Sequence, residues 1–251
     1  MRSLIVFATL ALLASPPVLG ADVPAHIAAA IAAPERSDKD RERDTRDRPA
    51  EVMEFAGIMQ GMAIADVFGG GGYWTELLAR AVGPDGKVTL VNNAPYLEFA
   101  REDIKTRFAD DRLPGVTRRT IETCDLKLGT AQLDLILIVM SYHDLYFVDE
   151  AGGWPGINAG GFLDQLHAAL KPDGALLIID HAAAAGSGSS AAQDIHRIEE
   201  AFAQRDIEGH GFKLEKTWDG YRNPADDLSK LVFDAAVRGK TDRFTHLYRR
   251  R

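Results

Sequence analysis

The chain has 251 residues, 46% of them hydrophobic, which suffices to bury one α/β core in a single domain. Its 29 Lys and Arg residues are outnumbered by 37 Asp and Glu residues, and the net charge of −8 argues against non-specific binding to nucleic acid or to an anionic membrane surface. The single cysteine, Cys124, excludes an internal disulfide and a metal site built from several cysteines.

The N-terminus has the pattern of a secretory signal peptide. Arg2 supplies positive charge, Leu4–Ala14 is an apolar run too short to span a bilayer comfortably, and small residues precede Ala21. We therefore expect residues 1–20 to be a signal peptide with cleavage near Gly20-Ala21, and the folded part to be periplasmic or secreted without stable membrane insertion. An uncleaved N-terminal membrane anchor is the alternative.

Residues 21–49 include a run, between Pro34 and Pro49, that has alternating charge signs and almost no apolar residues. Such a run contributes little to a core, so we expect a charged N-terminal segment or linker exposed to solvent.

From Ala50 onward, helix-like and strand-like segments alternate. The expected strands cover Met62–Ala65, Lys87–Val91, Val116–Ile121, Leu133–Met140, Ala175–Asp180, Phe212–Trp218 and Phe244–Arg249. The expected helices cover Ala50–Ile58, the segment from Tyr73 to the turn at Gly83, Pro95–Phe108, Phe162–Leu170 and a long helix from Ser190 to about Glu208. The alternation predicts an α/β fold with a mostly parallel sheet covered on both faces, and the last two strands suggest an antiparallel edge.

Four consecutive glycines, Gly69–Gly72, lie between the first expected strand and the helix that starts at Tyr73. Glycine permits positive φ and a close approach of a ligand to the backbone, and the first amides of the helix are unpaired. A phosphate-binding P-loop or a dinucleotide-binding loop would need other residues at Tyr73, Trp74 and Thr75. The loop is therefore expected to bind a different polar ligand, and a glycine-rich turn without a ligand is the alternative.

The loop resembles motif I of the class I S-adenosylmethionine (SAM)-dependent methyltransferases. The resemblance is carried by Asp66, Gly70, Gly72, Tyr73 and Thr75. It extends over residues 50–251, and implies a methyltransferase-like domain with a Rossmann-like, doubly wound sheet of about seven strands whose last strand is antiparallel. In that family the glycine loop packs under the methionine part of SAM. Many members close the cofactor cleft with an N-terminal segment, which here would bring Arg46 or Arg48 near the substrate.

The resemblance implies further cofactor contacts at the ends of later strands. Asn92 stands where the family has an acid that binds the ribose hydroxyls, and its carbonyl oxygen can accept one hydrogen bond. Asp125 matches the acid that meets the adenine amine, and Ser141 follows the fourth strand. Phe68 stands where the family usually has the first glycine of the motif.

His143 and Asp144 follow the fourth expected strand, where class I enzymes place residues that contact the substrate. A neutral imidazole at His143 would take a proton from an attacking hydroxyl or amine, so we expect His143 and Asp144 to be catalytic. A structural histidine is the alternative for His143 and is favoured for His181. No metal site is predicted, because the chain lacks a His-x-x-x-His or paired-cysteine spacing.

The sequence thus predicts a SAM-dependent methyltransferase that acts on a small-molecule acceptor outside the cytoplasm and has no nucleic-acid partner. Residues 142–146, 222–227 and 238–244 also resemble a group of predicted secreted bacterial methyltransferases. The alternative function is a non-catalytic periplasmic binding protein on a degenerate methyltransferase fold, which Phe68 and Asn92 favour.

Overall fold

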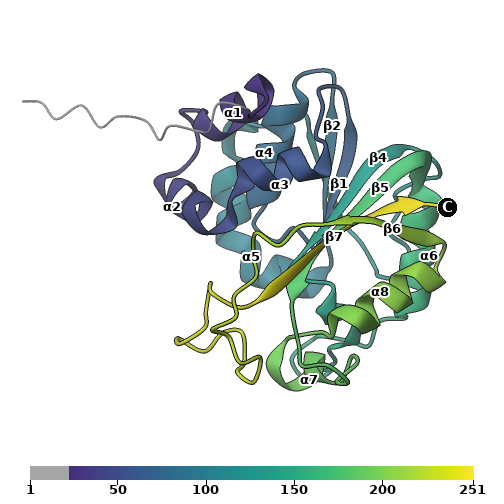
Figure 1. Cartoon of the computed structure of the whole chain (residues 1–251). Helices are drawn as coiled ribbons and strands as arrows, with labels where there is room; N and C mark the ends of the chain where they lie inside the picture. The colour runs from purple at the N-terminus through teal and green to yellow at the C-terminus, as the bar shows by residue number, and fades with distance from the viewer. Residues whose placement is uncertain (1–22) are drawn as a thin grey trace, which may run out of the picture.

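The computed structural model describes residues 23–251 (Figure 1). The expected signal peptide and its cleavage site near Gly20-Ala21 lie outside the described residues. Within residues 23–251, no helix combines the length and the apolar character that crossing a bilayer requires.

A single seven-stranded sheet organises the fold. Its strands are β1 (Ala63–Val67), β2 (Lys87–Asn92), β3 (Val116–Thr120), β4 (Leu133–Val139), β5 (Leu170–His181), β6 (Phe212–Thr217) and β7 (Arg243–Arg250). The spatial order is β3-β2-β1-β4-β5-β7-β6; β1 to β5 are parallel, and β7 is antiparallel to both of its neighbours. The predicted mostly parallel sheet with an antiparallel last strand is confirmed. Strand order reverses between β1 and β4, which is where open α/β sheets bind ligands.

Helices cover both faces of this sheet (Figure 1). They are α1 (Ala25–Ala32), α2 (Asp38–Asp47), α3 (Pro49–Ala56), α4 (Tyr73–Val82), α5 (Ala94–Arg107), α6 (Ala159–Ala169), α7 (Ala191–Ile195) and α8 (Glu200–Gly209), with 3₁₀ turns η1 (Ala109–Asp111) and η2 (His143–Tyr146). Apolar side chains of α1, α3 and α4 form the core on one face, and those of α6 and α8 form the core on the other. The central strands β1, β4 and β5 are therefore buried on both faces, as their near-continuous apolar sequences indicate.

The charged segment before Pro49 is folded, contrary to the expectation of a solvated linker. Asp38–Asp47 forms helix α2, and the hydroxyl of Ser37 caps it by accepting a hydrogen bond from the amide of Asp40. Arg36, Asp40 and Asp47 are buried. They are buried because each forms an ion pair, for example between Asp40 and Arg107 of α5 at 2.6 Å. Composition alone does not show such partners.

The single helix expected from Ser190 to Glu208 is also wrong, because the chain breaks between α7 and α8. His196 adopts a left-handed conformation, with φ 52° and ψ 49°, and Ile198 pairs with the backbone beside β5. The guanidinium of Arg197 is fully buried and binds the carboxylate of Asp226 at 2.8 Å. This buried pair fixes the break, and the break places His196 beside the carboxyl end of the sheet.

Candidate functional site

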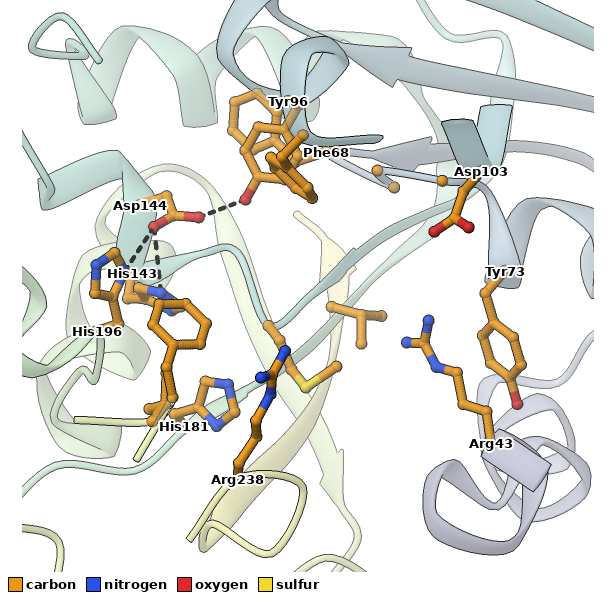
Figure 2. A pocket seen from close by; sticks show the side chains of 18 of the residues that line it. Arg43, Phe68, Tyr73, Tyr96, Asp103, His143, Asp144, His181, His196 and Arg238 are labelled. Carbon is orange, nitrogen blue, oxygen red and sulfur yellow. Dashed lines mark hydrogen bonds and ion pairs between the residues drawn. The ribbon is translucent and has the colours of Figure 1, made fainter. Parts of the chain in front are cut away.

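A cavity of about 620 Å³ opens at the carboxyl ends of β1, β4 and β5 (Figure 2). One side is formed by the backbone of Gly69, Gly70 and Gly71, and the other side carries a group of histidines and carboxylates. The volume lies within the range of about 300–1,000 Å³ that is typical of small-molecule sites. The position and the size of the cavity both indicate a ligand site.

Asp66 shapes the glycine loop from the protein side. Its carboxylate is buried and accepts a hydrogen bond of 2.6 Å from the hydroxyl of Thr75, which ties the end of β1 to the first turn of α4. A β-carbon at Gly69 would lie 2.4 Å from this carboxylate, so only glycine fits there. Burial raises the pKa of Asp66 to about 6, although hydrogen bonds from Thr75 oppose the shift.

Asn92, at the end of β2, binds the glycine loop itself. Its side-chain oxygen accepts a hydrogen bond of 3.0 Å from the amide of Gly70, and its side-chain nitrogen donates one of 2.9 Å to the carbonyl of Gly70. The side chain is buried and does not line the cavity. In this conformation Asn92 therefore holds the loop in place instead of facing a ligand.

Phe68 directly precedes the glycine loop, lines the cavity and packs against side chains of α5 and α6. Its backbone is left-handed at φ 55°, and its ring is stacked with Tyr96 and Phe162 at centroid distances of 4.7 and 5.4 Å. Ile121 and Leu126 belong to the same buried cluster. The positive φ is the conformation that glycine would adopt without strain, so the packing of the ring must offset its cost.

The structure brings together only some of the expected cofactor contacts. Gly70 and Tyr73 line the cavity, and the hydroxyl of Tyr73 donates a hydrogen bond of 2.7 Å to Asp44 of α2. Asp125 is exposed on a turn, and Ser141 is buried. The expected contacts that do not line the cavity are Asp66, Gly72, Asn92, Asp125 and Ser141.

The opposite side of the cavity is lined by both expected catalytic residues, His143 and Asp144. Asp180 of β5 lies behind them. The ring of His143 donates a hydrogen bond of 2.8 Å from Nδ1 to Asp180, whose second oxygen accepts a bond of 2.8 Å from the amide of His143. The other ring nitrogen, Nε2, lies 3.2 Å from Oδ1 of Asp144. The hydroxyl of Tyr96 donates to the remaining oxygen of Asp144. Both carboxylates are therefore held at fixed positions around one imidazole.

These contacts decide the charges of the group. Burial by itself would lower the pKa of His143, but the carboxylates of Asp180 and Asp144 raise it to about 10. The neutral imidazole expected at His143 is therefore an imidazolium near pH 7. Burial and the charge of His143 lower the pKa of His181, so His181 is neutral. Burial by itself would raise the pKa of Asp144, but the charge and the hydrogen bond of His143 lower it well below its usual range, so Asp144 is ionised.

The N-terminal segment lies at the cavity, as the resemblance implied, but neither Arg46 nor Arg48 lines it, and the residues of α2 and α5 that do were not predicted. Lys39 and Arg43 of α2 and Asp103 of α5 line the cavity beside the glycine loop, and Lys39 pairs with Asp103 at 2.9 Å. The spacing of four between Lys39 and Arg43 would have placed them on one face, had the charged run been recognised as a helix. His196 was missed because the helix break that positions it was not expected.

The comparisons with known proteins agree with this geometry. No protein-family model matches the chain. The ubiquinone/menaquinone biosynthesis C-methyltransferase UbiE of Pseudomonas paraeruginosa is 25% identical over 146 residues, a match that covers 58% of this chain and 52% of that protein. The chain thus spans about half the length of the curated relatives it matches.

Solved structures share the fold at lower identity. A SAM-dependent methyltransferase from Aquifex aeolicus aligns with a TM-score of 0.58 and 20% identity, over 85% of this chain and 97% of that chain. An arsenic(III) SAM methyltransferase from Chlamydomonas reinhardtii aligns with a TM-score of 0.54 and 17% identity, over 90% of this chain and 73% of that chain. The solved structures show that this chain has the fold of these SAM-dependent methyltransferases, and the curated proteins that it resembles in sequence are methyltransferases as well.

Proposed function

We propose that the chain is a SAM-dependent methyltransferase whose cavity holds both SAM and a small acceptor. The observation that carries the proposal is that one cavity connects the glycine loop after β1 with His143 and Asp144 after β4. The names of the sequence relatives and of the structural neighbours state methyl transfer and, for the neighbours, SAM. Volume supports a small acceptor, because about 620 Å³ has to accommodate both molecules.

The side of the cavity next to the glycine loop fits the amino-acid end of SAM. That end carries a carboxylate and an ammonium group, and the wall here offers charges of both signs. Figure 2 shows the guanidinium of Arg43 and the carboxylate of Asp103 facing the space beside the loop. Arg43 would hold the carboxylate, and Asp103 would hold the ammonium group.

The nucleoside end would be held mainly by aromatic surface. Asn92 and Asp125 do not reach the cavity, whereas Tyr96 and Phe99 line it. Phe99 is 66% exposed and lies against the loop, since a β-carbon at Gly70 would be 3.8 Å from its ring. Stacking on aromatic rings replaces hydrogen bonds as the expected source of affinity for the base.

SAM supplies an electrophilic methyl group on a sulfonium centre, and the protein has to align the acceptor with it. Asp144 lines the cavity and is held by His143 at Oδ1 and by the hydroxyl of Tyr96 at Oδ2, so its carboxylate is positioned to accept a hydrogen bond from an acceptor hydroxyl or amine. Asp180 fixes the orientation of the His143 ring. The ionised carboxylate of Asp144 favours a cationic centre in the cavity.

The rest of the wall supports an acceptor with a planar, apolar body. The rings of Phe147, Trp154 and Phe233 surround the histidine side of the cavity. We place the reaction outside the cytoplasm because of the signal-peptide pattern at the N-terminus.

Binding without turnover is the second candidate function. It is favoured by the use of both polar groups of Asn92 within the loop and by the packing of Phe68 where a glycine is usual in the superfamily. A protein that retains the cavity without productive alignment would bind SAM or a related nucleoside and release it unchanged.

Calorimetric titration of the chain with SAM and with S-adenosylhomocysteine tests the proposal. We expect one molecule bound per chain, and about tenfold weaker binding in Arg43→Gln, since a lost charge-assisted hydrogen bond costs about 1.5–3 kcal/mol. Arg46→Gln is the matched control, because Arg46 lies on the same helix and pairs with the same Asp47 but does not line the cavity. If neither compound gives a heat of binding at about 1 mM, any binding is weaker than about −4 kcal/mol. That result would contradict the proposal.

A further inference from the structure

Three side chains in the cavity have the types and the spacing of metal ligands. One nitrogen of His143, one oxygen of Asp144 and one nitrogen of His196 all lie within 4.8 Å of one another. His143 and Asp144 come from η2, and His196 comes from the break after α7. All three residues line the cavity (Figure 2).

His143 has the second partner that metal-binding histidines usually have. Its Nδ1 donates to the fully buried carboxylate of Asp180 at 2.8 Å, which leaves Nε2 directed toward Asp144 and the cavity. A carboxylate on the far side of the ring fixes the ring orientation and raises the basicity of Nε2, from which a bound cation would displace the proton. The backbone amide of His143 also donates to Asp180, so the position of the ring is doubly constrained.

Asp144 is arranged in the same way. The hydroxyl of Tyr96 occupies its Oδ2, while Oδ1 lies between the two imidazoles, 3.2 Å from Nε2 of His143 and 3.5 Å from Nδ1 of His196. One carboxylate oxygen shared between two imidazole nitrogens leaves a position that a cation can fill.

His196 is held at this position at a local cost. Its backbone is left-handed, with φ 52° and ψ 49°, a conformation that is strained for a residue with a side chain. Its ring packs against Phe147 and Phe233 at centroid distances of 4.5 and 5.2 Å. The buried Arg197–Asp226 pair directly after it maintains the break. The conformation serves to direct the imidazole into the cavity.

We propose that His143, Asp144 and His196 bind one divalent d-block cation of the zinc or ferrous type. Two imidazoles and one carboxylate suit these ions, whereas magnesium and calcium prefer oxygen ligands alone. Three protein ligands leave coordination positions open, and these face the cavity. The proposal departs from the expectation of no metal site, which rested on spacing within the sequence, and it does not depend on methyl transfer.

Calorimetric titration of the chelator-treated chain with zinc chloride at about pH 7.5, and separately with magnesium chloride, tests the proposal. We expect one zinc ion per chain, with a dissociation constant in the micromolar range or below, and no heat with magnesium. His196→Asn should weaken zinc binding about tenfold or more. Asparagine tolerates the left-handed conformation, so this variant removes the imidazole without disturbing the backbone. His210→Asn is the control, because His210 pairs with Asp164 outside the cavity and zinc binding should not change.

A second variant separates coordination from a structural ion pair. Asp180→Asn should weaken zinc binding about 10–100-fold, as loss of a partner behind a metal-bound histidine does elsewhere. The visible absorption spectrum of bound cobalt(II) should also change in His196→Asn and stay unchanged in His210→Asn. Zinc binding that is absent from the unaltered chain, or equal in the unaltered chain and His196→Asn, would overturn the proposal. SAM titration of the chelator-treated chain is a separate measurement, so failure of one proposal is distinguishable from failure of the other.

Discussion

The ring of Phe68 is stacked on the ring of Tyr96, with centroids 4.7 Å apart and an angle of 8° between their planes. The hydroxyl of Tyr96 in turn donates to Asp144. A continuous set of contacts therefore runs from the glycine loop to the histidine and carboxylate group. We therefore expect a displacement of the Phe68 ring to move Tyr96 and the hydroxyl that binds Asp144, because packed rings and a buried hydrogen bond connect them.

Replacing Phe68 with glycine should weaken the fold and improve SAM binding. The variant lacks the ring that packs on Tyr96 and Phe162, so stability is lost. Glycine adopts φ 55° without strain, and this offsets part of the lost stability. We expect the free energy of unfolding in urea to fall by roughly 2–4 kcal/mol, while the affinity for SAM rises. Phe162→Leu is the control, which should lower stability without improving affinity. Equal SAM affinities in Phe68→Gly and the unaltered chain would show that Phe68 does not restrict the site.

The two hydrogen bonds between the side chain of Asn92 and the backbone of Gly70 form a clamp on the glycine loop. The neighbouring residue Asn93 allows a test of this clamp. Asn92→Asp removes the donor to the carbonyl of Gly70 and places a charge at a buried position, so it should lower the free energy of unfolding by about 1–3 kcal/mol. Asn93→Asp should change it by less than about 0.5 kcal/mol, because Asn93 caps α5 through its side-chain oxygen and aspartate caps equally well. Urea unfolding of both variants measures the difference. The clamp is of little importance if both changes have the same effect.

Helix α2 is connected to the glycine loop through Arg107, which donates a hydrogen bond of 2.7 Å to the carbonyl of Gly71 and pairs with the buried Glu76. The carboxylate of Glu76 pairs with Arg80, Arg107 and Arg112, and Arg107 also pairs with Asp40 of α2 at 2.6 Å. Glu76→Gln leaves these guanidinium groups without a full counter-charge and should cost about 3–5 kcal/mol of unfolding free energy.

Glu98→Gln is the control for that change, because Glu98 belongs to an exposed ion pair that is worth about 1 kcal/mol at most. Thermal unfolding of both variants at matched salt concentration provides the comparison. A loss at Glu76 no larger than the loss at Glu98 would mean that the network does not stabilise the fold.

Asp66 gives a prediction for pH. Its folded pKa of about 6 lies above its ordinary value of 3.8, so the native state binds the proton more tightly than the unfolded state. The stability that this proton contributes is complete below pH 3.8 and is lost as the pH rises to about 6. Asp66→Asn stays neutral throughout, so its Tm relative to that of the unaltered chain should increase over this range and then level off. A difference in Tm that is the same at about pH 4 and about pH 7 would show that the pKa of Asp66 is not raised.

Much of the fold was predictable because local patterns agree with it. The apolar run Leu133–Met140 forms β4, and the alternation of strands and helices from Ala50 onward gives the seven-stranded sheet. The position of Gly70 beside the cavity also followed from its place between strand and helix.

The rest depends on partners far apart in the sequence. The capping pattern at Ser190 indicated one helix, but the break at His196 is fixed by Arg197 and by Asp226, 29 residues further on. In the same way, Asp40 of α2 is buried because its partner, Arg107, lies far along the sequence on α5. Asn92 was placed correctly at the end of β2, but its expected contact with a ligand is replaced by two hydrogen bonds to the backbone of Gly70. These bonds depend on the conformation of the glycine loop, which the sequence does not specify.

A crystal structure of the chain grown with saturating S-adenosylhomocysteine is the most direct test of the central claim that this cavity is the cofactor site. We expect the amino-acid end to lie against Gly69–Gly71 between Arg43 and Asp103, with the base on the aromatic wall at Phe99. Electron density for the compound at any other place, or a cavity that stays empty with Phe68 and Asn92 unmoved, would contradict it.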